Sequence, residues 1–238
     1  MSVHILYRGG FGNHLFEYVA ARLFAERHGL RVVTPWMESP LVTVSPHETG
    51  QRLQVSDPVL LTDRDDVWGE TRPPGRYILD GYFQDSERIY ENEAKIRSWL
   101  SAQDPGRAHT EDIAINLRIG PDYHERKWVI DPSWYLSILE KLTFRKLHIV
   151  CDALDPAYLS HFAKYEPAVI SSGATVDWWY LRRFERLVIA NSSFSWWAGF
   201  LSPSARKIWS FKPWVPYPTV RIGAFRNGEA VDGRLLYE

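Results

Sequence analysis

The stretch LVIANSSFSWWAGFL at residues 187–201 joins a short apolar run, a polar turn and a second apolar segment. Residues 187–190 are too few for a helix and predict a buried strand. Ser192 or Ser193 then suits the N-cap of a following helix. A strand that turns sharply into a helix presents backbone N–H groups at the positive end of the helix dipole, where anions bind. The stretch therefore predicts an α/β unit with an anion site, and an ordinary capped helix is the alternative.

Strands and helices alternate on both sides of this stretch. In the second half, strands are expected at 113–117, 147–151, 168–170 and 207–211, and helices at 132–142 (with Asp131 as N-cap), 155–163 and 177–186. In the first half, strands are expected at 3–7, 31–34 and 77–80. One helix is expected between a glycine-rich turn and Gly29, and a second at 84–100. Residues 35–74 predict loops and short helices, and residues 216–238 show no pattern. This alternation predicts the α/β class with two parallel-sheet domains.

A polar segment at residues 101–112 carries proline and glycine and is the best candidate for a domain boundary. It divides the chain into domains at 1–105 and 106–238. The net charge of −1 argues against a nucleic acid as the main partner, and the single Cys151 excludes a disulfide framework. No signal peptide and no apolar run of membrane-spanning length is visible, so we expect a cytoplasmic protein, with peripheral membrane association left open. The 11 tryptophans suit stacking against sugar rings as well as a core.

The first predicted strand leads into a glycine-rich turn, RGGFGN at residues 8–13. The turn resembles a dinucleotide fingerprint but lacks the third glycine and the acidic residue after the second strand, so NAD or FAD is disfavoured. We expect Gly10 and Gly12 to let the backbone meet another phosphate or sugar group. Asn13 is either a helix cap or a ligand contact.

An Asp-x-Asp sequence at residues 63–65 has the spacing with which some transferases hold a divalent ion, but a solvated charged loop explains it better. Arg118 follows a predicted strand, where α/β folds place ligand sites, and is either a surface charge or a phosphate clamp.

Three blocks of sequence, taken together, resemble the bacterial α-1,2-fucosyltransferases of glycosyltransferase family 11. They are GGFGNHLFEY at 9–18, which resembles GGLGNQMFQY, DGYFQ at 80–84, and NSSFSWW at 191–197, which is identical to the family's block. The resemblance covers residues 3 to 214 and implies a GT-B-like fold of two Rossmann-like domains with a donor cleft between them. It implies an acceptor-side N-terminal domain, a C-terminal domain that binds the nucleotide sugar, GDP-fucose as donor, and no metal or cofactor.

The chain departs from the family around residue 118. Where the family has His-x-Arg-Arg-Gly-Asp-Tyr, this sequence reads NLRIGPDY at 116–123, so histidine is replaced by Asn116, the second arginine by Ile119, and Pro121 is inserted. Glutamine is also replaced by His14 and by Glu17. A transferase that uses another activated deoxyhexose, such as rhamnose, and a non-catalytic nucleotide- or glycan-binding protein stay open as alternatives.

The resemblance and the chemistry of the leaving group assign the candidate site residues. Inverting transfer of L-fucose to a glycan hydroxyl, expected to form an α-1,2 linkage to a galactose-type acceptor, builds negative charge on the donor's β-phosphate. A planar guanidinium such as that of Arg118 can hold a phosphate bidentately. By resemblance, Asp177 would accept from the guanine edge, and a helix N-cap is its alternative role. The candidate catalytic residues are Arg118, Asp122, Glu17 and His14, the last three as bases, and the candidate donor-binding residues are Gly10, Gly12, Asn13, Asn116, Asp177, Ser192, Ser193 and Phe194. Trp196 and Trp197 are expected in the core.

Overall fold

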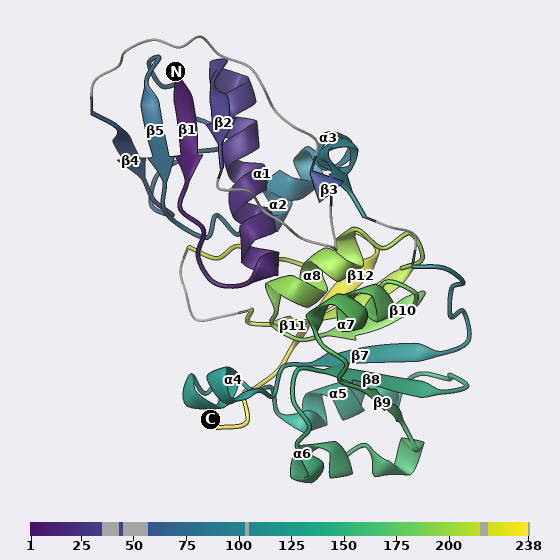
Figure 1. Ribbon diagram of the computed structural model, residues 1–238. Coiled ribbons are helices and arrows are strands. Elements are labelled where there is room, and N and C mark those ends of the chain that lie inside the picture. The colour runs from purple at the N-terminus through teal and green to yellow at the C-terminus, as the bar shows by residue number, and fades with distance from the viewer. Residues whose placement is uncertain (35–42, 45–56, 103–104, 215–218, 238) are drawn as a thin grey trace. The chain divides into compact units, whose positions relative to one another are not determined.

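The computed structural model describes residues 1–34, 43–44, 57–102, 105–214 and 219–237, and the chain divides into two compact units (Figure 1). The first comprises Met1–Ala102 and Tyr217–Gly223, and the second comprises Gln103–Pro216 and Ala224–Glu238. The expected division placed 217–223 with the second half, and this is wrong. Backbone hydrogen bonds draw Arg221 into the first unit, because its N–H donates to Gln84 and its carbonyl accepts from Ser86, at 2.8 and 3.0 Å. Such long-range bonds leave no local pattern.

The first unit is built on a parallel sheet of four strands in the order β2-β1-β5-β4. Its strands are β1 Ser2–Ile5, β2 Arg31–Val33, β4 Val59–Leu61 and β5 Arg76–Leu79, and β3 Thr43–Val44 pairs with β6 Leu100–Ser101 in a small antiparallel sheet. Helix α1, Phe11–His28, packs on β1 and β2 (Figure 1). It ends as expected at Gly29, whose φ of 62° is accessible to glycine at little cost. Strand β4 falls where only loops and short helices were expected.

The helix expected at 84–100 is two helices, α2 Ser86–Glu91 and α3 Glu93–Trp99. Asp85 starts the first by accepting hydrogen bonds from the backbone N–H groups of residues 87 and 88. Asn92 separates the two, with φ of −112° and ψ of 18° that are not helical. A periodicity of apolar residues continues across such a break, which is why the sequence predicts one helix.

The second unit carries a parallel sheet of six strands in the order β12-β11-β10-β7-β8-β9. Its strands are β7 Ile113–Leu117, β8 Leu147–Cys151, β9 Ala168–Ile170, β10 Arg186–Ile189, β11 Lys207–Lys212 and β12 Gly228–Asp232. Its helices are α4 Pro121–Glu125, α5 Pro132–Leu139, α6 Pro156–Ser160, α7 Ala174–Leu181 and α8 Ser193–Phe200, with a 3-10 turn at Ala163–Tyr165. Counted within the unit, the order is 6-5-4-1-2-3, the arrangement of dinucleotide-binding sheets.

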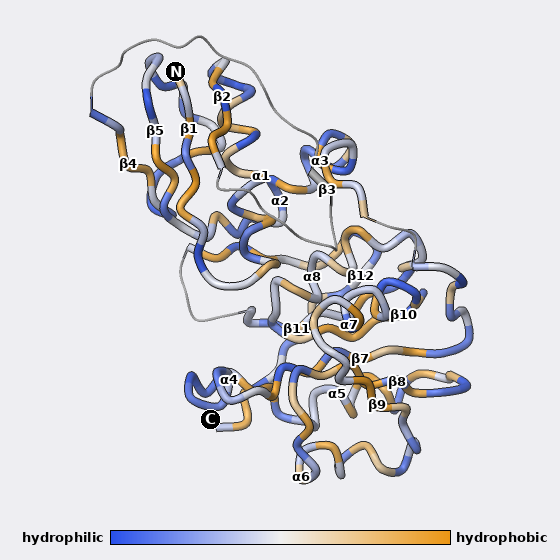
Figure 2. Tube along the Cα trace, viewed as in Figure 1, coloured by the Kyte–Doolittle hydropathy of each residue, from blue (hydrophilic) through white to orange (hydrophobic). Residues whose placement is uncertain are grey.

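Several elements of this unit differ from the sequence-based expectation. Strand β12 lies in the tail that showed no pattern, and it pairs with β11 along its length. Helix α7 begins at residue 174 and ends at 181, three and five residues before the expected bounds of 177 and 186. Helix α4, hydrophilic along its length in Figure 2, was not expected. The β7, β8 and β9 bounds match the prediction. Strands β7 and β8 are buried along their length and β9 is a partly exposed edge strand, but all three are short, mainly apolar runs in the sequence.

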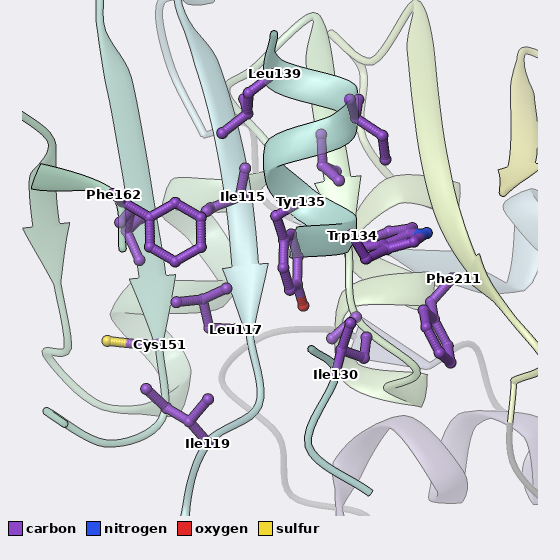
Figure 3. Close-up of a cluster of buried hydrophobic side chains, with 14 of the residues drawn as sticks. Ile115, Leu117, Ile119, Ile130, Trp134, Tyr135, Leu139, Cys151, Phe162 and Phe211 are labelled. Atoms are coloured by element: carbon purple, nitrogen blue, oxygen red, sulfur yellow. The ribbon is translucent and has the colours of Figure 1, made fainter. Parts of the chain in front are cut away.

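Helices cover both faces of this sheet. Alternate residues of the strands, such as Ile115 and Leu117 of β7, pack against Tyr135 of α5 and against Phe162 (Figure 3). The intervening residues face α7 and α8, because successive side chains of a strand point to opposite faces. Asn116 and His148 therefore lie on the α7 and α8 face. Trp196 and Trp197 are fully buried, which confirms their expected place in the core.

The architecture is thus α/β with two parallel sheets, as the sequence predicts. Among the described residues, no helix is both long enough and apolar enough to pass through a bilayer.

Candidate functional site

The strand order of the second unit defines where a ligand can bind. Strands β7 and β10 are neighbours, and the chain proceeds from β7 toward β9 on one side and from β10 toward β12 on the other. In open parallel sheets, ligands bind outside the carboxyl ends of the strands at such a reversal. Arg118 directly follows β7, and Asn191 lies two residues after the end of β10. The fold therefore brings Arg118 and the turn of the NSSFSWW block to one edge.

Arg118 is held by two carboxylates and an aromatic ring. Its two terminal guanidinium nitrogens lie 3.0 Å from Asp122 Oδ2 and 3.0 Å from Asp152 Oδ2. Its Cζ lies 4.5 Å from the centroid of the Tyr123 ring, in a cation–π contact. The Arg118 side chain is 26% exposed and that of Asp122 is 55% exposed. Asp122 would have to leave Arg118 before the nitrogen that it contacts could bind a ligand, and an exposed ion pair of this kind costs only about 0.2–1 kcal/mol to break.

Asp152 is a site residue that the sequence analysis missed. It follows β8, and its Oδ1 accepts hydrogen bonds from the N–H groups of Ile119 and Gly120, at 2.8 and 3.2 Å. A Cβ on Gly120 would lie 2.5 Å from Asp152 Oδ2, so a larger residue there would displace this carboxylate. The sequence contained a signal for this residue, because Asp152 directly follows the apolar run of β8 as Arg118 directly follows that of β7. A carboxylate after a strand is common, however, and only the tertiary structure places it against Arg118.

A hydrogen bond links the Arg118 loop to the NSSFSWW turn. The Tyr123 hydroxyl donates to the backbone carbonyl of Asn191 at 2.8 Å, and the Asn191 amide donates to the Trp128 carbonyl at 3.2 Å. Burial raises the pKa of Tyr123, which keeps the hydroxyl protonated as the donor. The two halves of the candidate site are thus fixed relative to each other within the second unit.

Ser192 is the N-cap of α8, as expected, but its role as an anion donor is not supported. Its backbone N–H already donates to the Ala190 carbonyl at 2.8 Å, because the chain turns tightly after β10. Ser193 and Phe194 occupy the first turn of α8, at the positive end of the helix dipole. Both residues are partly exposed. Ser193 and Phe194 thus stay candidates for the expected anion site at this helix.

Asp177 lies in the first turn of α7 and is not its N-cap, which is Gly173. Its Oδ1 accepts a hydrogen bond from the N–H of Ser172 at 2.9 Å. Asp177 is 5% exposed, and burial raises the pKa of this carboxyl. The following Trp178 donates its indole N–H to the Phe194 carbonyl at 3.2 Å, which ties the start of α7 to the start of α8.

Asn116 is buried at 3% exposure near the end of β7. Its side-chain amide donates to the Val150 carbonyl of β8 at 3.1 Å. Among the described residues, its Oδ1 has no hydrogen-bond partner. A buried acceptor of this kind can receive a hydrogen bond from a ligand.

The candidate residues of the first unit lie at the start of α1. Gly10, and not Asn13, is the N-cap of this helix. Asn13 Oδ1 accepts a hydrogen bond from the Gln84 side-chain amide at 2.8 Å, so the GGFGN and DGYFQ blocks meet. Gly9 has a φ of 69°, and a Cβ there would lie 2.3 Å from Asn13 Nδ2. Gly12 is buried in the first turn, whereas a Cβ on Gly10 would meet nothing within 4 Å.

Glu17 and His14 differ in the environment of their titratable groups. Glu17 is fully buried, and both of its oxygens accept from the backbone N–H of Arg8, at 3.1 and 3.2 Å. Burial nevertheless raises the pKa of the Glu17 carboxyl from 4.5 to about 8. His14 is partly exposed with its ring 4.8 Å from that of Tyr7, and burial lowers its pKa. At neutral pH, Glu17 is thus mainly protonated and His14 is mainly neutral.

The Asp-x-Asp carboxylates serve the backbone of the first unit. Asp63 accepts from the N–H groups of Tyr82 and Phe83, at 2.9 and 2.6 Å, which holds the turn of the DGYFQ block. Asp65 accepts from the N–H and hydroxyl of Thr62, at 2.8 and 3.1 Å. Asp63 therefore accepts from a turn distant in the chain, whereas Asp65 holds its own local turn.

The fold can be compared with solved structures. No protein-family model and no curated protein matches the sequence. A NodZ α-1,6-fucosyltransferase soaked with GDP-fucose aligns with a TM-score of 0.56 and 13% identity, over 89% of this chain and 95% of that chain. A NodZ α-1,6-fucosyltransferase co-crystallized with GDP aligns with a TM-score of 0.55 and 13% identity, over 89% of this chain and 95% of that chain. NodZ from Bradyrhizobium aligns at 0.54, with 13% identity, over 87% of this chain and 94% of that one. At this identity the likeness concerns the fold, and the chain therefore has the GT-B-like α/β fold of these fucosyltransferases.

Proposed function

We propose that the chain is a glycosyltransferase that moves L-fucose from GDP-fucose to a glycan hydroxyl with inversion at the anomeric carbon. The observation that carries the proposal is the position of Arg118 and the NSSFSWW turn at the reversal of strand order in the second unit. The GT-B-like fold shared with structures of a GDP-fucose-soaked fucosyltransferase supports it. The proposed linkage is α-1,2 to a galactose-type acceptor, on the strength of the sequence resemblance.

The proposed role of Arg118 is to stabilise the leaving GDP. Negative charge grows on the β-phosphate as the bond to the sugar breaks, and preorganised donors there lower the barrier. The fork of Arg118 can hold two phosphate oxygens once Asp122 moves away, while Asp152 keeps the guanidinium oriented through its other terminal nitrogen. The amides of Ser193 and Phe194 would add two donors at the helix terminus.

The proposed contacts to guanine are Asp177 and Asn116. The carboxylate of Asp177 uses Oδ1 for the Ser172 N–H, and Oδ2 is the oxygen that we assign to the guanine N1–H and N2–H. Asn116 Oδ1, a buried acceptor, is assigned to the base or the ribose. Uracil offers one N–H on this edge, so the pair would favour GDP over UDP.

The base that deprotonates the acceptor is proposed to be Asp122 or His14. Asp122 is exposed, and its release from Arg118 on donor binding would free a carboxylate beside the reacting centre. His14 is neutral at physiological pH and so can accept a proton. Glu17 is the weakest of the three candidates, because its buried carboxyl holds its own proton up to about pH 8. We propose that the first unit forms the acceptor side and that Asn13, Gly10 and Gly12 bind the donor, as the resemblance implies.

A non-catalytic nucleotide-binding role is the second candidate function. The observation that favours it is the pairing of Arg118 with two carboxylates, which neutralises the cation that the reaction needs. This role predicts that GDP binds without turnover.

The deciding experiment incubates the protein with GDP-fucose, a GDP-linked and a TDP-linked rhamnose donor, and UDP-galactose, each with and without a galactose-terminated glycan. Release of GDP from GDP-fucose, accelerated by the glycan, and a product heavier by one deoxyhexose support the proposal. Turnover of another donor with GDP-fucose untouched would transfer the assignment to that sugar. Tight GDP binding with no turnover of any donor would establish the binding role.

A further inference from the structure

Two imidazoles and a carboxylate gather at the amino edge of the second unit's sheet: His109, Asp112 and His148. Asp112 directly precedes β7, and His148 is the second residue of β8. Parallel strands all run the same way, so this edge is opposite to the one that carries Arg118. The cluster is therefore separate from the candidate donor site.

The atoms of the cluster have the spacing of metal ligands. Nδ1 of His109 and Nε2 of His148 lie 3.0 and 3.3 Å from Oδ2 of Asp112. One ligand atom from each of the three residues lies within 4.8 Å of the others. Zinc bound tetrahedrally at about 2.0–2.1 Å from nitrogen and oxygen places neighbouring ligand atoms about 3.3 Å apart. Small side-chain shifts would bring all three atoms to one ion.

Neighbouring groups orient both imidazoles. The hydroxyl of Tyr180 lies 2.9 Å from Nδ1 of His148, which leaves Nε2 of that ring directed at Asp112. The ring of His109 stacks on Phe184, with centroids 4.4 Å apart and planes at 9°. Its backbone N–H also donates to the Arg183 carbonyl at 2.7 Å. The Tyr180 hydroxyl thus holds His148 as an outer hydrogen-bond partner holds a metal-binding histidine.

The hydrogen bonds of Asp112 are unevenly distributed. Oδ2 is hydrogen-bonded to both imidazoles, and it also accepts a hydrogen bond from the guanidinium of Arg145 at 2.8 Å. Among the described residues, Oδ1 of Asp112 and Nε2 of His109 are buried without a hydrogen-bond partner. The Asp112 side chain is 1% exposed, whereas that of Arg145 is 66% exposed and also lies 3.7 Å from Glu111. Arg145 can therefore move aside while Asp112 stays.

A pocket gives an ion access to this place. It has a volume of about 330 Å³ and is lined by residues 107–112 together with Arg145 and Arg183. Two residues of the cluster, His109 and Asp112, thus line the pocket.

We propose that His109, Asp112 and His148 bind one Zn²⁺, with water as the fourth ligand. Two imidazoles and a carboxylate suit zinc, whereas magnesium prefers oxygen ligands alone. The ion would tie the segment that leads into β7 to the neighbouring strand β8. Its effect would be on the stability of the second unit, independent of the proposed transfer reaction.

The test uses the full chain without a histidine tag, stripped with a chelator and dialysed. Titration with zinc chloride in a calorimeter should show one equivalent bound with a Kd of about 1 μM or tighter. Excess zinc should raise the Tm by several degrees, because an ion that binds only the folded state stabilises it, and excess magnesium should not. Absence of a one-equivalent zinc site in the wild-type chain would overturn the proposal, whatever the variants do.

Matched variants locate the site. His109→Gln and Asp112→Asn should each weaken zinc binding at least tenfold, and Tyr180→Phe, which removes only the outer partner, about tenfold. His161→Gln removes an exposed histidine outside the cluster and should leave the affinity unchanged. Equal affinity in the wild type and in folded His109→Gln would place the zinc elsewhere and refute the assignment.

A further variant separates a metal site from a hydrogen-bonded network. Arg145→Gln removes the cation that competes for Asp112. It should tighten zinc binding several-fold if the ion occupies the cluster. Weaker binding in this variant would contradict the proposed ligand set.

Discussion

Replacement of Arg118 by alanine separates a role in catalysis from a role in folding. The substitution removes two ion pairs of 3.0 Å and the contact 4.5 Å above the Tyr123 ring. Partly exposed ion pairs contribute about 0.2–1 kcal/mol each, and a cation–π contact contributes about 0.5–1 kcal/mol. The free energy of unfolding should therefore fall by roughly 1–3 kcal/mol, and the Tm by about 3–10 °C.

The expected loss of turnover is much larger than this loss of stability. Removing one donor to the developing negative charge lowers kcat by about 10²–10³, whereas GDP binding should weaken less, because the interaction acts mainly in the transition state. Arg118→Lys keeps the charge but loses the bidentate fork and should recover only part of the rate. The three measurements are kcat at saturating GDP-fucose, the Kd of GDP by calorimetry, and the Tm.

Arg126→Ala is the matched control. Arg126 is an exposed arginine whose Cζ lies 4.9 Å from the Trp128 ring, so its loss removes a similar contact outside the candidate site. Its kcat should stay near that of the wild type. A folded Arg118→Ala protein with near-normal kcat would refute the role of Arg118 in the reaction.

Three further predictions concern guanine recognition, a buried carboxyl and metal removal. Asp177→Asn should reduce the preference for GDP over UDP, which we expect to be at least tenfold in the wild type; equal Kd values for GDP and UDP in the wild-type chain would refute the role of Asp177. Burial raises the pKa of Glu17 to about 8, so its contribution to the free energy of unfolding is complete below pH 4.5 and is lost as the pH rises to 8, by up to about 1.4 kcal/mol per pH unit. In denaturant melts, Glu17→Gln should remove this dependence of the unfolding free energy on pH. An unchanged dependence would contradict the shifted pKa. Transfer at 25 °C should survive EDTA while the Tm falls, because the proposed zinc site lies at the opposite edge of the sheet; loss of kcat restored by manganese would show a catalytic metal.

Local patterns determined much of the second unit. Strands β7, β8 and β9 have the predicted bounds, because each is a short run that is mainly apolar and is bounded by polar residues or proline. Asp131 caps α5 as expected, since its carboxylate accepts the N–H of Ser133 two residues later. Such features depend on neighbours in sequence and can be predicted from it.

The predictions that failed concern elements whose stability comes from distant partners. Strand β12 has little apolar character and is a strand because it pairs with β11. Residue Arg221 belongs to the first unit through hydrogen bonds to residues 84 and 86, far away in sequence. Burial also decided the state of Glu17, whose place in the helix pattern gives no measure of its pKa.

The candidate site shows the same division. The sequence by itself determined that Arg118 and the NSSFSWW block each follow a strand, which is enough to place both at the carboxyl edge of a parallel sheet. Only the tertiary structure decided that β7 and β10 are neighbours and that Asp152 holds Arg118. The physical reason is that strand order and side-chain pairing are set by packing between segments distant in the chain, whereas the strands themselves are set by local apolar character.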